Sequence, residues 1–218
     1  MSRRSLFVSL FLSVCAFASS GVAQAGAVTA VPCFAKTKAV IANTGQGTYN
    51  ANSTVQGDVQ AGGAIVKNGN AVITGTQKAN TPAGLAVVPV PTGATNLGNF
   101  VVSGTVNLPA GNYVASSFNM NGGAVLNVTG GVAQIWVTGS VALTGTANAG
   151  GDPTNLELLV TSNQSVNVNS GAAITAFIYA PAAPVIVSGA VTGSVVGSTT
   201  TINSGGRVTF VSGAQCAN

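Results

Sequence analysis

Charge is what this sequence has least of. Its 218 residues include only three Asp and Glu, seven Lys and Arg, and no His, so that charged side chains make up 5% of the chain. No charged residue lies between Lys78 and Asp152, or between Glu157 and Arg207. Acid–base catalysis needs positioned titratable groups, and metal sites need clustered His, Cys or carboxylate ligands. The sequence therefore predicts a protein that is not an enzyme and that has no catalytic residues, metal or cofactor.

Two of the three acidic residues are near enough in sequence to be considered as a carboxylate pair. Asp152 and Glu157 would suit a glycan-processing enzyme if their side chains met. Asp152, however, follows two glycines and precedes Pro153, which is typical of a turn. Glu157 alternates with Leu156 and Leu158, which predicts a solvent-facing strand position. We therefore expect structural roles for both carboxylates.

The N-terminus has the three parts of a secretory signal. A basic Ser2-Arg3-Arg4 precedes an apolar run from Leu6 to Ala18, and Ala23-Gln24-Ala25 predicts cleavage between Ala25 and Gly26. The apolar run is too short for a membrane-spanning helix, and no span is expected in the mature chain. We expect an exported protein of the extracellular space or cell envelope, either periplasm or outer surface. Cleavage leaves five bases and three acids, a net charge too small for a nucleic-acid-binding protein.

Two cysteines remain after cleavage, Cys33 and Cys216, near the two ends of the mature chain. In an oxidising compartment such a pair usually forms a disulfide. An elongated fold keeps its ends apart, so the bridge requires the N-terminal segment to run to the C-terminal end of the molecule. Independent thiols and intermolecular bridges are the alternatives.

Helix signals are scarce, whereas short β-branched runs recur between small residues. The clearest example is Ile174 to Gly206, where strand-like runs follow the pairs Ser170-Gly171, Ser188-Gly189 and Ser204-Gly205 at nearly equal intervals. Ala176 and Ser194 each begin a run five residues after the glycine of such a pair. This imperfect repeat predicts an all-β fold, a parallel β-helix or β-solenoid. A β-sandwich, which also has many short strands, is the alternative.

The chain divides into three parts. Residues 1–25 are the signal peptide, residues 26–98 hold N-terminal strands and a connection, and residues 99–218 form a β-helix domain. The connection contains Pro82, Pro89 and Pro91, which cannot donate ladder hydrogen bonds. At roughly 16–25 residues a coil and about 4.8 Å between strands, the mature chain predicts eight to ten coils in a rod on the order of 40–50 Å long.

Two sets of residues suggest surface chemistry. Thr199 and Thr201 lie on one face of a predicted strand, where hydroxyl groups aligned in a row can bind ordered water or glycans. A Thr-x-Thr pattern does not repeat on the other coils, which weighs against ice binding. The aromatic residues Tyr113, Trp136 and Tyr179 would make a sugar platform if exposed, although core packing is the commoner role.

The C-terminal half resembles a family of secreted, Gly-rich bacterial β-helix proteins of unassigned function from cell-envelope and pilus-associated contexts. The matching segments are LPAGNYVASSFNMNGGAVLNVTG (108–130), IWVTGSVALTG (135–145), GGDPTNLELLVT (150–161) and AFIYAPAAPVIVSGAVTGSVVG (176–197). The resemblance implies a right-handed parallel β-helix. It carries over no catalytic residue.

Together these features predict a non-catalytic structural or adhesive protein. A self-assembling fibre or coat subunit is one alternative, because uncapped coil ends invite stacking. A glycan-binding or glycan-processing β-helix is another. The expected partners are a second copy of the chain or a cell-surface polymer or glycan, and not nucleic acid.

Overall fold

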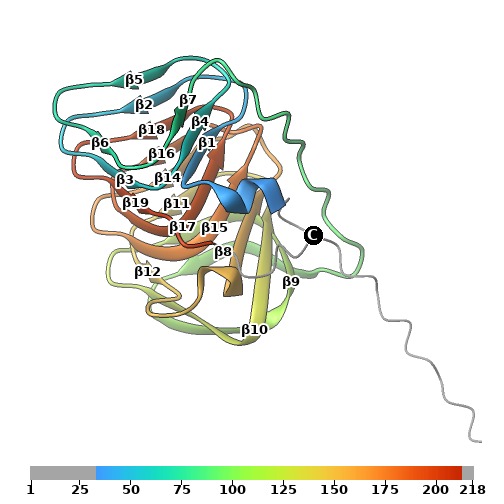
Figure 1. Cartoon of the computed structure of the whole chain (residues 1–218). Helices are drawn as coiled ribbons and strands as arrows, with labels where there is room; N and C mark the ends of the chain where they lie inside the picture. The colour runs from blue at the N-terminus through green and yellow to red at the C-terminus, as the bar shows by residue number, and fades with distance from the viewer. Residues whose placement is uncertain (1–32, 213–218) are drawn as a thin grey trace, which may run out of the picture.

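The computed structural model describes residues 33–212, and these residues form a β-solenoid of parallel coils (Figure 1). Two short 3-10 helices, η1 (Cys33–Thr37) and η2 (Pro153–Asn155), are the helical elements of this part of the chain. The strands are β1 (Val40–Ala42), β2 (Gly47–Tyr49), β3 (Thr54–Gln56), β4 (Val59–Ala61), β5 (Ile65–Lys67), β6 (Val72–Ile73), β7 (Gln77–Lys78), β8 (Thr95–Val102), β9 (Thr105–Met120), β10 (Val125–Val137), β11 (Val141–Leu143), β12 (Thr146–Ala147), β13 (Leu156–Val160), β14 (Val166–Val168), β15 (Ala173–Ala180), β16 (Val185–Val187), β17 (Ala190–Gly197), β18 (Thr200–Ile202) and β19 (Arg207–Thr209).

The strands stack into three faces, and every strand pair is parallel. The asparagine face contains, in stacking order, β8, β9, β11, β14, β16, β18, β2 and β5. The threonine face contains β9, β10, β12, β15, β17, β19, β3 and β6. The covered face contains β8, β9, β10, β13, β15, β17, β1, β4 and β7. The predicted solenoid is thus confirmed, and the sandwich alternative is wrong.

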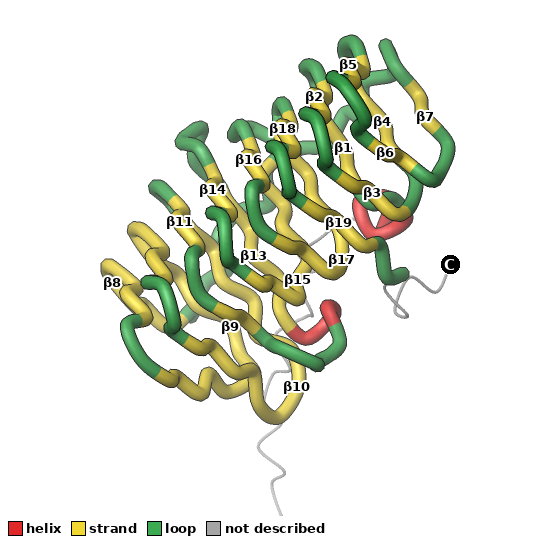
Figure 2. The backbone as a smooth tube through the Cα atoms, turned by 90° about the vertical axis from the view of Figure 1, so that its left-hand side faces the viewer, coloured by secondary structure: helices red, strands yellow, loops and turns green. Residues whose placement is uncertain are grey.

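The coils are not stacked in the order of the sequence. The N-terminal strands β1, β2 and β3 pair with β17, β18 and β19 of the C-terminal coils. The stack therefore starts at β8, rises to β19 and continues with β1 to β7. Residues 79–94 contain no strand and run from β7 along the side of the stack to β8 at the opposite end (Figures 1 and 2).

Alternation along the strands places apolar side chains inside the solenoid, and most of them are alanine, valine or isoleucine. In β14, for example, Val166 and Val168 are fully buried while Asn167 between them faces outward. The exact register corrects one expectation, because Phe177, and not Ala176, pairs with Ser194. The turn after Ser170 contains one residue more than the turn after Ser188, so the paired residues of β15 and β17 repeat at a slightly shorter interval than the Ser-Gly pairs.

A second apolar core lies outside the solenoid, on the covered face. Its members are outward-facing strand residues, Ile41, Trp136, Leu159, Phe177, Tyr179 and Val196, together with Ala35 of η1 and the partly buried Ala83, Leu85, Val88 and Val114. The helix η1 and the segment 83–88 therefore shield this face from water. The sugar platform considered from the sequence does not form, because Trp136 and Tyr179 are buried here. The Tyr179 hydroxyl donates a 2.6 Å hydrogen bond to the Ala86 carbonyl, and burial raises its pKa to about 12.

Both ends of the stack carry residues that disfavour further strand pairing. Within residues 33–212, no strand pairs with the outer edges of β5, β6 and β7. Lys67 lies in register with buried Tyr49, and Lys78 lies in the last rung of the covered face. At the other end, Pro109 stands in the part of β9 that pairs with β10 alone. Edge lysines and prolines of this kind block edge-to-edge association.

We expect the variant Lys67→Val/Lys78→Val to associate end to end, because it removes both charges from the open edge. Light scattering on a sizing column should show a single-chain mass for the parent protein and multi-chain species for the variant. The matched control, Lys67→Glu/Lys78→Glu, keeps the edge charged and should remain a single chain. A monomeric valine variant would show that the lysines are not what prevents stacking.

Candidate binding face

The carboxylates of the chain do not gather into a catalytic site. Asp152 caps η2, where its Oδ1 accepts hydrogen bonds from the Thr154 backbone N–H at 2.8 Å and the Thr154 hydroxyl at 2.7 Å. These bonds hold the pKa of Asp152 below its usual range. The turn predicted there is confirmed. Among the described residues, no three His, Cys, Asp or Glu side chains lie close enough to hold a metal ion.

The solvent-facing position expected for Glu157 is wrong, because the residue is only 3% exposed. It does point away from Leu156 and Leu158, yet the face it points to is covered by η1. Its carboxylate forms a 2.5 Å ion pair with Lys36 of that helix. Alternation along one strand shows which side a residue faces, but it does not reveal what another segment places on that side.

The threonine face presents two outward columns to solvent. The first column contains, in stacking order, Thr105, Val125, Thr146, Ala173, Ala190, Arg207, Thr54 and Val72. The second contains Asn107 and Asn127 at one end and, farther along, Thr175, Thr192, Thr209 and Gln56. Members on neighbouring strands are separated by one interstrand spacing of about 4.8 Å, and one rung without a member lies between Asn127 and Thr175. The longest uninterrupted run of small polar side chains in these columns is Thr175, Thr192 and Thr209, on three consecutive coils.

Hydroxyl groups on this face are available to a ligand. The side chains of Thr54, Thr105, Thr146, Thr175, Thr192 and Thr209 make no hydrogen bond to any residue in the range 33–212. Polar side chains along the asparagine face are different, because several bond to one another from coil to coil. Asn68 donates to Asn50 at 2.9 Å, and Asn50 donates to Asn203 at 3.1 Å. The threonine face is therefore the better candidate for binding.

The sequence analysis did not identify the threonine column of this face. Thr175, Thr192 and Thr209 occupy one column, with one threonine on each of three consecutive coils, and they recur at equal intervals along the chain. The search for Thr-x-Thr pairs within single strands could not find it. The pair that the sequence did single out, Thr199 and Thr201, does alternate with a buried residue, Thr200. Thr201 lies in β18 on the asparagine face, where it pairs with Thr48, whereas Thr199 lies in the turn before that strand.

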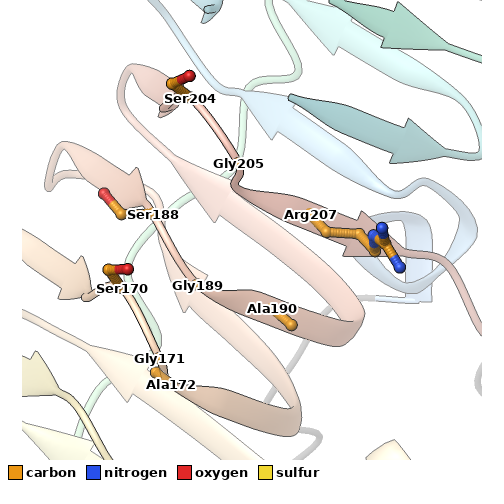
Figure 3. Close-up of a pocket in the computed structure, with 9 residues that line it drawn as sticks. All are labelled: Ser170, Gly171, Ala172, Ser188, Gly189, Ala190, Ser204, Gly205 and Arg207. Carbon is orange, nitrogen blue, oxygen red and sulfur yellow. The ribbon is translucent and has the colours of Figure 1, made fainter. Parts of the chain in front are cut away.

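A shallow open hollow of about 330 Å³ borders the threonine face. Its rim is the Ser-Gly repeat of the sequence: Ser170-Gly171, Ser188-Gly189 and Ser204-Gly205, with Ala172, Ala190 and Arg207 beside them. Figure 3 shows these turns following one another along the stack, with Arg207 on the strand after the last of them. Arg207 is exposed and forms no ion pair with the rest of residues 33–212.

Of three comparisons with known proteins, the one with solved structures bears on this architecture. A domain of unknown function (DUF7305) matches residues 133–213, which is less than half of the chain. No curated protein matches. A crystal structure of an ice-binding protein from the Antarctic ascomycete Antarctomyces psychrotrophicus is similar at a TM-score of 0.59 and 17% identity, and the match covers 83% of this chain and 98% of that one. At this identity the likeness concerns the fold.

None of the helices in the described part of the chain is long and apolar enough to cross a membrane.

Proposed function

We propose that the protein is an exported, non-catalytic surface-binding module that attaches to ice through its threonine face. The observation that carries the proposal is the column of Thr175, Thr192 and Thr209 on three consecutive coils, whose hydroxyls have no hydrogen-bond partner among the described residues. Because these groups are fixed to stacked strands, they lose little conformational entropy when they meet an ordered surface. An extended ligand with its own repeat, such as a crystal surface, can then engage many weak contacts at once.

Two further observations support this function. The two columns of the face carry a single charged residue, Arg207, so binding requires little desolvation of charge. A protein of similar fold is described as ice-binding, which makes ice the natural first probe. The edge lysines and proline disfavour the fibre alternative, because they oppose stacking of one solenoid on another.

Substitution in the threonine column tests the proposal. We expect Thr192→Lys to reduce partition of the full chain into growing ice by roughly tenfold or more, equivalent to about 1.4 kcal/mol, because a long charged side chain breaks the flat array. Thr201→Lys is the matched control, since it places the same side chain on the asparagine face, and it should partition like the parent. Equal partition of both variants would show that this face does not bind ice.

A hydroxylated polymer with negative charges is a second candidate ligand, and Arg207 is the observation that favours it. Its exposed guanidinium, between Ala190 and Thr54 in the first column, suits a carboxylated polysaccharide better than ice. Retention of the parent chain on pectate beads, lost in Arg207→Gln, together with no partition into ice, would select this candidate over the first.

A further inference from the structure

A partly buried polar cluster beneath η1 joins three side chains that the proposed function does not use. The Glu157 carboxylate contacts Lys36 Nζ through Oε1 at 2.5 Å and accepts a hydrogen bond from Gln134 Nε2 through Oε2 at 2.8 Å. One carboxylate therefore bridges a primary amine and a primary carboxamide. The three residues come from η1, β10 and β13, which are distant in sequence.

The surroundings of the cluster are largely dry. The side chains of Lys36 and Glu157 are 12% and 4% exposed. Lys36 Nζ lies 5.3 Å from the centroid of the Phe177 ring, and Trp136 and Leu159 belong to the same apolar core. Water therefore has little access to the amine and the carboxylate, and the Gln134 amide beside them is partly buried.

The positions of the three groups are fixed by the fold. Gln134, Glu157, Phe177 and Ser194 occupy one outward column of the covered face, in consecutive rungs. The Ser194 hydroxyl contacts the Ala35 carbonyl at 2.8 Å and the Lys38 carbonyl at 2.6 Å, on either side of Lys36. The rigid sheet therefore holds the amide and the carboxylate, while Ser194 anchors the helix that presents the amine.

We propose that Lys36 and Gln134 form an intramolecular isopeptide bond, with Glu157 as the catalytic residue. Lys36 Nζ transfers a proton to Glu157, and the neutral amine attacks Gln134 Cδ. The Nζ–Cδ bond forms, and Glu157 returns the proton to Nε2 as the Cδ–Nε2 bond breaks. The second ammonium proton of Lys36 leaves with the ammonia as ammonium. The overall change converts one ammonium side chain and one carboxamide into a secondary amide and free ammonium, and no oxidant or cofactor is needed.

Proximity and exclusion of water make this exchange feasible without a second enzyme. Held reactants reach effective molarities on the order of 10⁵ M or more in well-oriented intramolecular reactions. A dry site also prevents hydrolysis from competing with attack by the amine. The product would fasten η1 and the first coil to β10 by a covalent bond, independently of any ligand on the threonine face.

Mass spectrometry of the reduced, denatured full chain tests the proposal directly. The measured mass should be lower, by the mass of one ammonia, than the mass calculated for the sequence that starts at the observed N-terminal residue. Since no Lys or Arg lies between Lys78 and Arg207, trypsin should release a species that joins the peptide containing Lys36 to residues 79–207. Lys38→Arg is the matched control and should retain the deficit.

Three outcomes would overturn it. An unmodified parent mass would leave the cluster a simple ion pair with a hydrogen bond. Persistence of the deficit in Gln134→Met would place the bond elsewhere. A mass deficit of one water, mapped to Lys36 and Glu157, would show that Lys36 forms its amide bond with the Glu157 carboxyl group and not with Gln134. Glu157→Gln should abolish the deficit, and because the parent mass alone decides the matter, poor folding of that variant does not affect the test.

Discussion

Replacing Gly193 with alanine is expected to lower the free energy of unfolding by about 4 kcal/mol or more, a large share of the typical total for a domain. Gly193 lies in β17 at a corner of the coil with φ of +133°. A Cβ atom there would stand 2.1 Å from the Ala176 carbonyl oxygen of the neighbouring rung. That oxygen belongs to the paired strand and cannot withdraw without disturbing the ladder. Urea unfolding, followed by the fluorescence of the single tryptophan, Trp136, measures the effect.

Gly205→Ala separates the clash from the backbone strain. Gly205 also has a positive φ, +79°, but a Cβ atom on it would meet nothing within 4 Å. Its cost should therefore be that of the left-handed conformation alone, roughly 1–2 kcal/mol. Equal midpoints for the two alanine variants would contradict the steric argument, because they would show that the β17 corner relaxes freely.

We predict that Cys33 and Cys216 form an intramolecular disulfide. Reduction of the protein is therefore expected to lower its free energy of unfolding by about 4–5 kcal/mol, the chain-entropy value for a very long loop. Cys216 lies outside the described residues. The described residues nearest in sequence to the two cysteines approach each other at Gly57. A Cβ atom on Gly57 would lie 3.1 Å from Ala39 Cβ and 2.7 Å from Phe210 Cβ. Ala39 follows Cys33 closely in the sequence, and Phe210 precedes Cys216 by the same short interval.

Mass spectrometry of the unreduced chain after alkylation checks the pairing, and thermal melts with and without reductant check its contribution. The parent melting temperature should fall in reductant, whereas a Cys33→Ser/Cys216→Ser variant should melt at the same temperature in both buffers. Two alkylated thiols in the untreated parent would contradict the pairing.

Local patterns were enough to predict the strands but not their order. Runs such as Val166 to Val168 specify a short strand with one buried side, and the Ser-Gly pairs specify turns. The same local pattern fits any neighbour in a parallel stack, so it contains no signal that places β1 against β17. The signal peptide and its cleavage between Ala25 and Gly26, which lie outside the described residues, stay predictions.

The candidate binding face was hidden from the sequence for a related reason. Thr175, Thr192 and Thr209 meet only because three coils have equal length along that face, and the turns elsewhere vary. Glu157 shows a second limit, since it does point away from Leu156 and Leu158, but the solvent-facing position expected from this was wrong because Lys36 of η1, near the start of the described residues, lies against it. Long-range partners of this kind require the assembled fold.

The position of the N-terminal coils has a consequence for how the chain acquires its structure. Val40 pairs with Val195, and a long stretch of sequence separates the two residues, so this contact has a high sequence separation. Folding rates fall as contacts become more distant in sequence, and partly folded chains with unpaired edges are prone to aggregate. Until these pairings form, the edges of β1, β2 and β3 that face the C-terminal coils lack their partner strands. We therefore expect the contacts of β1, β2 and β3 with β17, β18 and β19 to form late in folding, after the coils from β8 to β19 have stacked.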